Sequence, residues 1–100
     1  MQKEYKDKIY RFFEDPGHGW LEVHEAEIEN LNIKDKITSC SYYDKKEKLV
    51  YLEEDCDAPL FIKTYCKEYN MPENNFKNKI NFIYKDTIPF RYYDRYNTKT

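Results

Sequence analysis

Three segments of the sequence carry side chains that could contact a ligand or take part in catalysis. The first is the loop Asp15-Pro16-Gly17-His18-Gly19-Trp20, where the only two glycines of the chain flank an imidazole that precedes its single tryptophan. Such rings can stack on a ligand, and glycines allow its close approach. The same residues can equally form a turn that leads into a core tryptophan. We therefore name His18 and Trp20 as candidate ligand contacts, with the turn as the alternative.

The second segment is acidic, with four carboxylates in the run Glu53-Glu54-Asp55-Cys56-Asp57. Crowded carboxylates can bind a divalent cation or meet a basic partner surface. The spacing is not that of a calcium-binding loop, and no second carboxylate cluster completes a two-metal site. We therefore predict no metal, place Asp57 as the N-cap of a following helix, and keep Glu53, Glu54 and Asp55 as candidate partner contacts.

The third segment, Arg91 to Tyr96, interleaves arginines and tyrosines. These residue types grip phosphates and stack on bases, and they are also common at sheet edges and oligomer interfaces. Arg91, Tyr93 and Arg95 are the candidates here. With 17 basic and 19 acidic side chains, the net charge of -2 excludes a field that would hold polyanions by charge alone. Any nucleic-acid contact would have to be local.

Nothing in the sequence defines a catalytic centre. The chain contains no nucleophile-elbow, zincin, Walker or dinucleotide-binding motif, and its two histidines exclude a three-histidine metal site. A Cys56 nucleophile with a His18 base is conceivable on residue types alone. The sequence thus favours a non-catalytic protein without a cofactor.

The three cysteines are odd in number and show no C-x-x-C spacing. Neither a disulfide framework nor a cysteine zinc site is indicated. We predict reduced thiols, with Cys40 and Cys66 as small apolar filler and Cys56 in a more polar setting.

One hundred residues predict a single domain, 1–100, whose ends (about 1–6 and 97–100) should fray. Apolar patterning predicts strands at 8–13, 37–43, 48–52 and 78–84, re-entry into the core at 20–23, and helices at 25–31 and from Asp57 to Tyr69. Asn32 should supply a left-handed residue after the first helix. The expected class is α+β, a small antiparallel sheet of about four to five strands with two helices packed on one face.

Location and assembly follow from the same patterns. No run approaches the roughly 18 apolar residues of a membrane span, and the first residues lack a secretion signal. We expect a cytoplasmic protein. The alternation in 81–84 leaves large apolar side chains on both faces of a strand, so we predict a homodimer through this segment and residues 89–93.

The chain also resembles a family of small uncharacterised phage and prophage proteins. The resemblance rests on the segments Asp15 to Val23, Asp35 to Thr38 with Ser41-Tyr42, and Tyr51 to Asp57 with Phe61, and Asn32 replaces a glycine usual in that family. It implies a phage-encoded accessory protein and no known activity.

Three functional hypotheses result. The first is a non-catalytic phage protein that inhibits a host defence system, for example CRISPR, by contact with a host protein or by sequestering a nucleotide-like small ligand. The second is a nucleic-acid-binding accessory factor that uses Arg91 and Arg95. The third is a metal-dependent hydrolase built on the acidic segment and His18.

Overall fold

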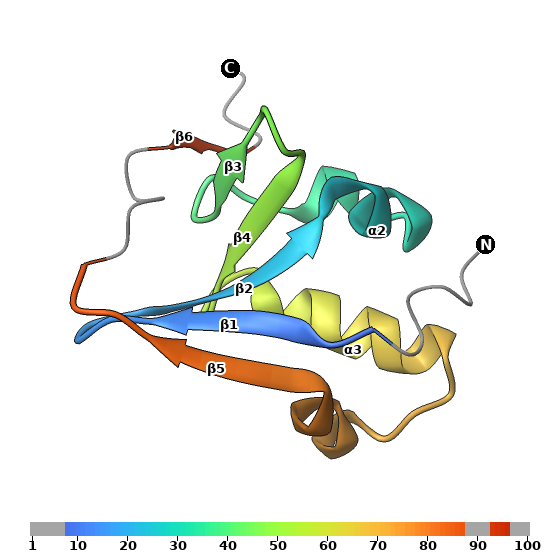
Figure 1. Cartoon of the computed structure of the whole chain (residues 1–100). Coiled ribbons are helices and arrows are strands. Elements are labelled where there is room, and N and C mark those ends of the chain that lie inside the picture. Colours follow the sequence, from blue (N-terminus) through green and yellow to red (C-terminus); the bar gives the residue numbers. More distant parts are fainter. Residues whose placement is uncertain (1–7, 88–92, 97–100) are drawn as a thin grey trace.

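The computed structural model describes residues 8–87 and 93–96, and these form a six-stranded sheet with helices on one face (Figure 1). The strand order is β5-β1-β2-β4-β3-β6. The strands are β1 (Tyr10–Glu14), β2 (Gly19–His24), β3 (Tyr42–Asp44), β4 (Leu49–Glu53), β5 (Ile80–Tyr84) and β6 (Asp94–Arg95). The helical elements are α2 (Glu25–Asn30), η1 (Lys34–Lys36), α3 (Ala58–Glu68) and η2 (Glu73–Lys79). The predicted α+β class is confirmed.

The sheet departs from the prediction in being mixed. Four neighbouring pairs are antiparallel, but β1 and β5 run parallel, with Tyr10 opposite Ile80. A parallel pair needs a long crossover, which α3 and η2 provide between β4 and β5. The segment 37–41, predicted as strand, precedes β3 as turn and loop, because its polar groups bind a side chain described below.

The core on the helical side of the sheet is aromatic, as the composition indicates. Tyr10 from β1 contacts the rings of Phe61, Tyr65 and Phe76, at centroid distances of 5.9, 5.9 and 5.5 Å. Leu21, Val23, Val50 and Leu52 complete the face that the sheet presents to these helices. This packing fixes α3 against the strands.

The opposite face carries a second cluster, formed only by strand residues among those described. Phe13, Trp20, Tyr42 and Tyr51 are its members. The buried carboxylate of Glu22 lies beside them and accepts two hydrogen bonds of 2.8 Å from Arg11 and one of 3.0 Å from the Tyr51 hydroxyl. Because a buried charge is costly unless it is paired, these bonds allow Glu22 to stay in this face.

Local signals explain the helix ends. Asn32 has a φ of 61°, and the amide of Ile33 bonds the carbonyl of Ile28 at 3.2 Å, so the predicted left-handed stop after α2 is confirmed. Asn70, with a φ of 54°, does the same after α3. Asparagine enters this region because its short polar side chain can bond locally.

Strand β5 forms one edge of the sheet and leaves large side chains in solvent. Phe82 is 56% exposed and Tyr84 is 60% exposed. The predicted dimer interface includes this strand, whereas most of its second part, residues 89–92 with Arg91, lies outside the described residues. The homodimer therefore stays a prediction.

Candidate functional site

A hollow of about 360 Å³ brings together candidate residues that are distant in sequence. It is lined by His18, Trp20, Cys40, Tyr42, Glu53 and Arg95. Four of these, His18, Trp20, Glu53 and Arg95, are among the candidates named from the sequence. They converge because β2, β4, β3 and β6 are successive neighbours in the sheet.

Trp20 and Tyr42 form the floor of this hollow. Their ring centroids are 6.2 Å apart, and they are only 2% and 9% exposed. His18 is exposed, and its ring lies 5.6 Å from that of Trp20 at an angle of 31°. Trp20 is thus a core residue, as the turn alternative predicts, and it also lines a surface hollow, whereas ligand contact by His18 or Trp20 stays a prediction.

The loop before β2 is closed by Asp15 and not by unusual glycine angles. The Asp15 carboxylate accepts hydrogen bonds from the amides of Gly17 at 3.0 Å and His18 at 2.8 Å. Neither glycine has a positive φ. At Gly19 a Cβ would lie 2.6 Å from the ring of Phe12, so this glycine is required by packing against β1. Gly19 therefore serves the fold, whereas a Cβ at Gly17 would meet open space.

Arg95 forms one wall of the hollow and is held there by several contacts. Its guanidinium carbon lies 4.5 Å from the ring centroid of Tyr42, and the group donates hydrogen bonds to the carbonyls of Ser39 at 3.1 Å and Cys40 at 3.4 Å. Such a stacked and bonded guanidinium is held in one orientation. The Arg95 side chain therefore links β6 to the loop before β3.

The acidic segment divides between the two faces of the sheet. Glu53 faces the hollow opposite Trp20, and its carboxylate accepts the amide of Asp55 at 2.9 Å. Glu54 points the other way, toward Gly19. Burial raises the pKa of Glu54, and the negative charges of Asp55, Glu14 and Glu53 raise it further. Carboxylates thus crowd this end of the sheet.

Asp57 does not cap α3 with its side chain, which corrects the prediction. It precedes the helix but has helical angles, φ -99° and ψ -25°, whereas a capping residue normally has extended ones. Its carboxylate, in a residue 2% exposed, instead accepts the Thr38 amide at 3.1 Å to each oxygen, the Thr38 hydroxyl at 2.9 Å and the Ser41 hydroxyl at 2.6 Å. Asp57 therefore anchors the loop 38–41 beside the hollow.

Two of the three cysteines are joined, so the prediction of reduced thiols is wrong for them. Cys40 and Cys56 form a disulfide across a sequence separation of 16, with Cα atoms 6.5 Å apart. Cys40 is exposed and is not apolar filler, whereas Cys66 is a buried thiol as predicted. A disulfide sulfur cannot serve as the nucleophile considered for Cys56.

The remaining candidates do not join the hollow's lining. Tyr93 packs near Tyr51, with ring centroids 6.0 Å apart. Tyr96 is buried and donates a hydrogen bond of 2.9 Å from its hydroxyl to Glu25. Arg91 lies outside the described residues. Within residues 8–87 and 93–96, no three His, Cys, Asp or Glu side chains gather closely enough to hold a metal ion.

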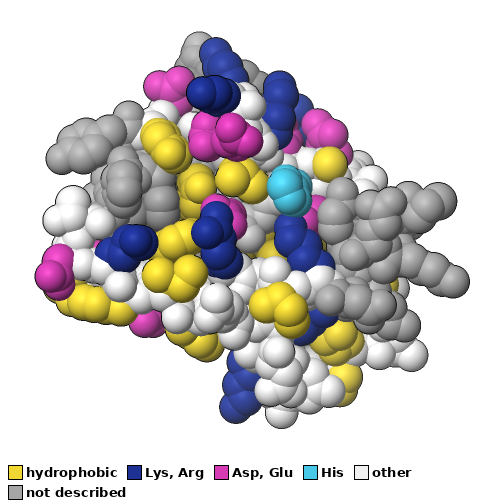
Figure 2. All heavy atoms as spheres, viewed as in Figure 1, with side chains coloured by type: hydrophobic (Ala, Val, Ile, Leu, Met, Phe, Trp, Pro, Cys, Tyr) yellow, Lys and Arg dark blue, Asp and Glu magenta, His cyan; other side chains and the backbone are white. Residues whose placement is uncertain are grey.

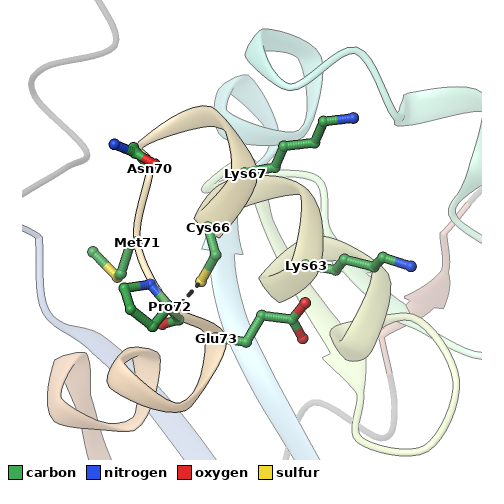
Figure 3. Close-up of a pocket in the computed structure, with 7 residues that line it drawn as sticks. All are labelled: Lys63, Cys66, Lys67, Asn70, Met71, Pro72 and Glu73. Carbon is green, nitrogen blue, oxygen red and sulfur yellow. Dashed lines mark hydrogen bonds between the residues drawn. The ribbon is translucent and has the colours of Figure 1, made fainter.

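A second hollow, of about 630 Å³, lies at the end of α3, and none of the candidate contact residues named from the sequence lines it (Figure 3). The Cys66 thiol lies 3.9 Å from the carbonyl oxygen of Pro72, and the ammonium groups of Lys63 and Lys67 extend away from the sulfur. Burial raises the pKa of the Cys66 thiol, as does the charge of Glu73. This hollow therefore offers no reactive thiolate at neutral pH.

No family model, curated protein or solved structure matches this chain. Among the described residues, no helix is both long and apolar enough to cross a bilayer. The face shown in Figure 2 mixes hydrophobic, basic and acidic side chains, and neither charge dominates it. Function therefore has to be argued from the hollow itself.

Proposed function

We propose that this chain is a non-catalytic binding protein that holds a host protein at the hollow lined by His18, Trp20, Glu53 and Arg95. The observation that carries the proposal is this convergence of four residues from separate segments on one surface depression. Depressions with aromatic floors and polar rims are typical of sites that receive a partner's side chain.

The solvent exposure of the residues that line the hollow favours a protein partner over a sequestered small ligand. Small-ligand sites usually bury about 70–90% of the ligand. Here the rim residues His18, Cys40 and Arg95 are exposed, while the ring faces of Trp20 and Tyr42 are covered and offer no stacking platform. An open depression of this kind suits one projecting side chain of a larger surface.

Charge indicates a basic partner. The carboxylates at this end of the sheet are Glu14, Asp15, Glu53, Glu54 and Asp55. Among the described residues that line the hollow, Arg95 is the only lysine or arginine, and its guanidinium is already bonded to two carbonyls. Complementary charge steers association, so a lysine or arginine side chain beside Glu53 is the favoured occupant. The same carboxylates would repel a nucleotide phosphate.

The two alternatives receive less support. For nucleic-acid binding, Arg95 is engaged with the loop before β3. For a metal-dependent hydrolase, the carboxylates diverge, since Asp57 points to loop 38–41 and Glu54 points away from Glu53 across the sheet. Neither alternative gains an observation of its own.

The resemblance to phage proteins extends the proposal to a cytoplasmic inhibitor of a host defence system. Expression in bacteria that carry a panel of defence systems, followed by phage challenge, tests this part. Protection of the phage against one system is expected, and a panel without any protection contradicts it.

Binding at the hollow can be tested with Trp20, because it is the single tryptophan of the chain and lies in the floor. Titration with a hexa-arginine peptide should change its emission, and hexa-glutamate should not. Glu53→Gln should weaken binding about threefold, the range expected for one exposed ion pair. Glu47→Gln, which removes the same charge from the exposed turn between β3 and β4, is the control. Equal losses in both variants, or unchanged emission, would overturn the proposal.

A further inference from the structure

The Cys40–Cys56 disulfide lies at the wall of the hollow and links two loops that the sheet brings together. Cys40 precedes β3 and Cys56 precedes α3. Cys40 is exposed and Cys56 is partly buried, so a thiol from solution can reach the bond. Among disulfides, exposed ones are the labile and regulatory ones.

The surroundings of Cys56 suit both redox states. The Thr38 hydroxyl oxygen lies 3.3 Å from the Cys56 sulfur and donates its proton to Asp57 at 2.9 Å. In the reduced protein, the Cys56 thiol can donate to this hydroxyl oxygen, which keeps its own bond to Asp57. Reduction therefore leaves Cys56 with a hydrogen-bond acceptor already in place.

We propose that Cys40 and Cys56 are a reversible thiol–disulfide exchange site for low-molecular-weight monothiols, and that their redox state sets the shape of the hollow. The role in partner binding rests on the function proposed above, whereas the exchange itself does not. The cytoplasmic location predicted from the sequence agrees with it, since disulfides there are mostly transient and redox-sensing.

The exchange proceeds in two balanced steps. A monothiolate attacks the exposed Cys40 sulfur, the bond between the two protein sulfurs breaks, and Cys56 leaves as a thiolate that takes a proton from water. A second monothiolate attacks the small-molecule sulfur of the mixed disulfide, and Cys40 leaves as a thiolate. The protein disulfide is reduced to two thiols, and two monothiols are oxidised to one disulfide.

The effect on the hollow follows from what holds loop 38–41. Asp57 fixes Thr38 and Ser41 in either state, because its bonds do not involve sulfur. The side chain of Cys40 is tethered by the disulfide, whereas its backbone amide donates to the Thr38 hydroxyl at 3.1 Å and its carbonyl accepts a bond from Arg95. Reduction should therefore free the Cys40 side chain, which forms one wall of the hollow, and leave Arg95 and the backbone of the loop in place.

Alkylation under native conditions tests the exchange. The protein is equilibrated in buffers that range from oxidised to reduced glutathione, treated with iodoacetamide and analysed by peptide mass. Cys40 and Cys56 should both be modified in reduced glutathione and protected in oxidised glutathione. Cys66, which is buried, should react only after unfolding and serves as the internal control. Cysteines that stay protected in reduced glutathione, or stay reactive in oxidised glutathione, would overturn the proposal.

The emission of Trp20 tests the coupling to the hollow. Reduction should shift the emission and its quenching by iodide, and the Cys40→Ser/Cys56→Ser double variant should match the reduced protein in every buffer. Affinity for hexa-arginine should fall roughly two- to tenfold on reduction, the range for losing the order of one side chain, that of Cys40. If the Trp20 emission is the same in the oxidised and reduced protein, the proposed effect of the redox state on the hollow is wrong. If the peptide fails to bind either state while emission and alkylation respond, the function proposed above fails and the redox site stands.

Discussion

Replacement of Asp57 by asparagine distinguishes a helix cap from a loop anchor. Asparagine caps helices as well as aspartate does, so a capping role predicts almost no change in stability. In the structure, however, the carboxylate accepts bonds from the Thr38 amide, the Thr38 hydroxyl and the Ser41 hydroxyl. An amide group cannot accept at both positions, because one of its ends is a donor.

The size of the effect follows from the bonds that are lost. Leaving a buried donor unsatisfied costs about 1–3 kcal/mol, and bonds to charged groups lie at the upper end. Both hydroxyls bond the same oxygen of Asp57 and can keep the amide oxygen, whereas the NH2 group at the other position would face the Thr38 N–H, whose bond to that oxygen is lost together with the negative charge. We expect Asp57→Asn to lower the free energy of unfolding by about 3 kcal/mol, roughly 12–24 °C in Tm for a domain of this size.

Urea unfolding followed by Trp20 fluorescence measures this change. Asp55→Asn is the matched control, since Asp55 is exposed and its side chain makes none of these bonds. The control should stay within about 0.5 kcal/mol of the parent protein. If Asp57→Asn also stays within that range, the loop-anchor role is wrong and capping explains Asp57.

Three further predictions concern the two glycines, pH and assembly. Gly19→Ala should destabilise by about 1–3 kcal/mol because its Cβ would collide with the ring of Phe12, whereas Gly17→Ala, with open space around it, should be close to neutral in the same urea assay. For Glu25, burial raises the pKa, but hydrogen bonds from two tyrosine hydroxyls and the charge of a lysine outweigh it, and the net pKa is lowered. This stabilisation is present above the unfolded pKa, about 4.3, and lost as pH falls through the folded value, so the stability difference between the parent and Glu25→Gln should shrink toward pH 3 in acid titrations. Light scattering should show the predicted homodimer, which Phe82→Lys should convert to monomer; a parent protein that is monomeric at high micromolar concentration would contradict it.

The sequence predicts the elements whose signals are local. The helix from Ala58 to Glu68 follows from its apolar stripe, and Phe61 and Tyr65 are buried as that stripe requires. Asn32 ends α2 in the left-handed conformation, which few residue types other than glycine and asparagine adopt. These features depend on neighbours within about one or two helical turns, which a linear pattern contains.

Features that depend on distant partners are not predictable from such patterns. The parallel pairing of β1 with β5 joins segments about seventy residues apart, and no local residue preference encodes it. Likewise, Cys40 and Cys56 meet because β3 and β4 form a hairpin, which places the residues after β4 beside those before β3. The candidate residues of the hollow were found individually by residue type, but their convergence required the strand order.

The second aromatic cluster gives the hollow a rigid floor beneath an adjustable rim. Trp20 and Tyr42 belong to the buried group whose neighbour Glu22 is fixed by Arg11 and Tyr51, so moving the floor would expose a paired carboxylate. The rim residues are exposed and are held by a disulfide, which a thiol from solution can open, and by hydrogen bonds to backbone carbonyls. Changes in the rim should therefore alter binding without loss of the fold, whereas changes in the floor should alter both. If the chain binds a partner as proposed, this division lets the rim adapt to the partner while the fold stays constant.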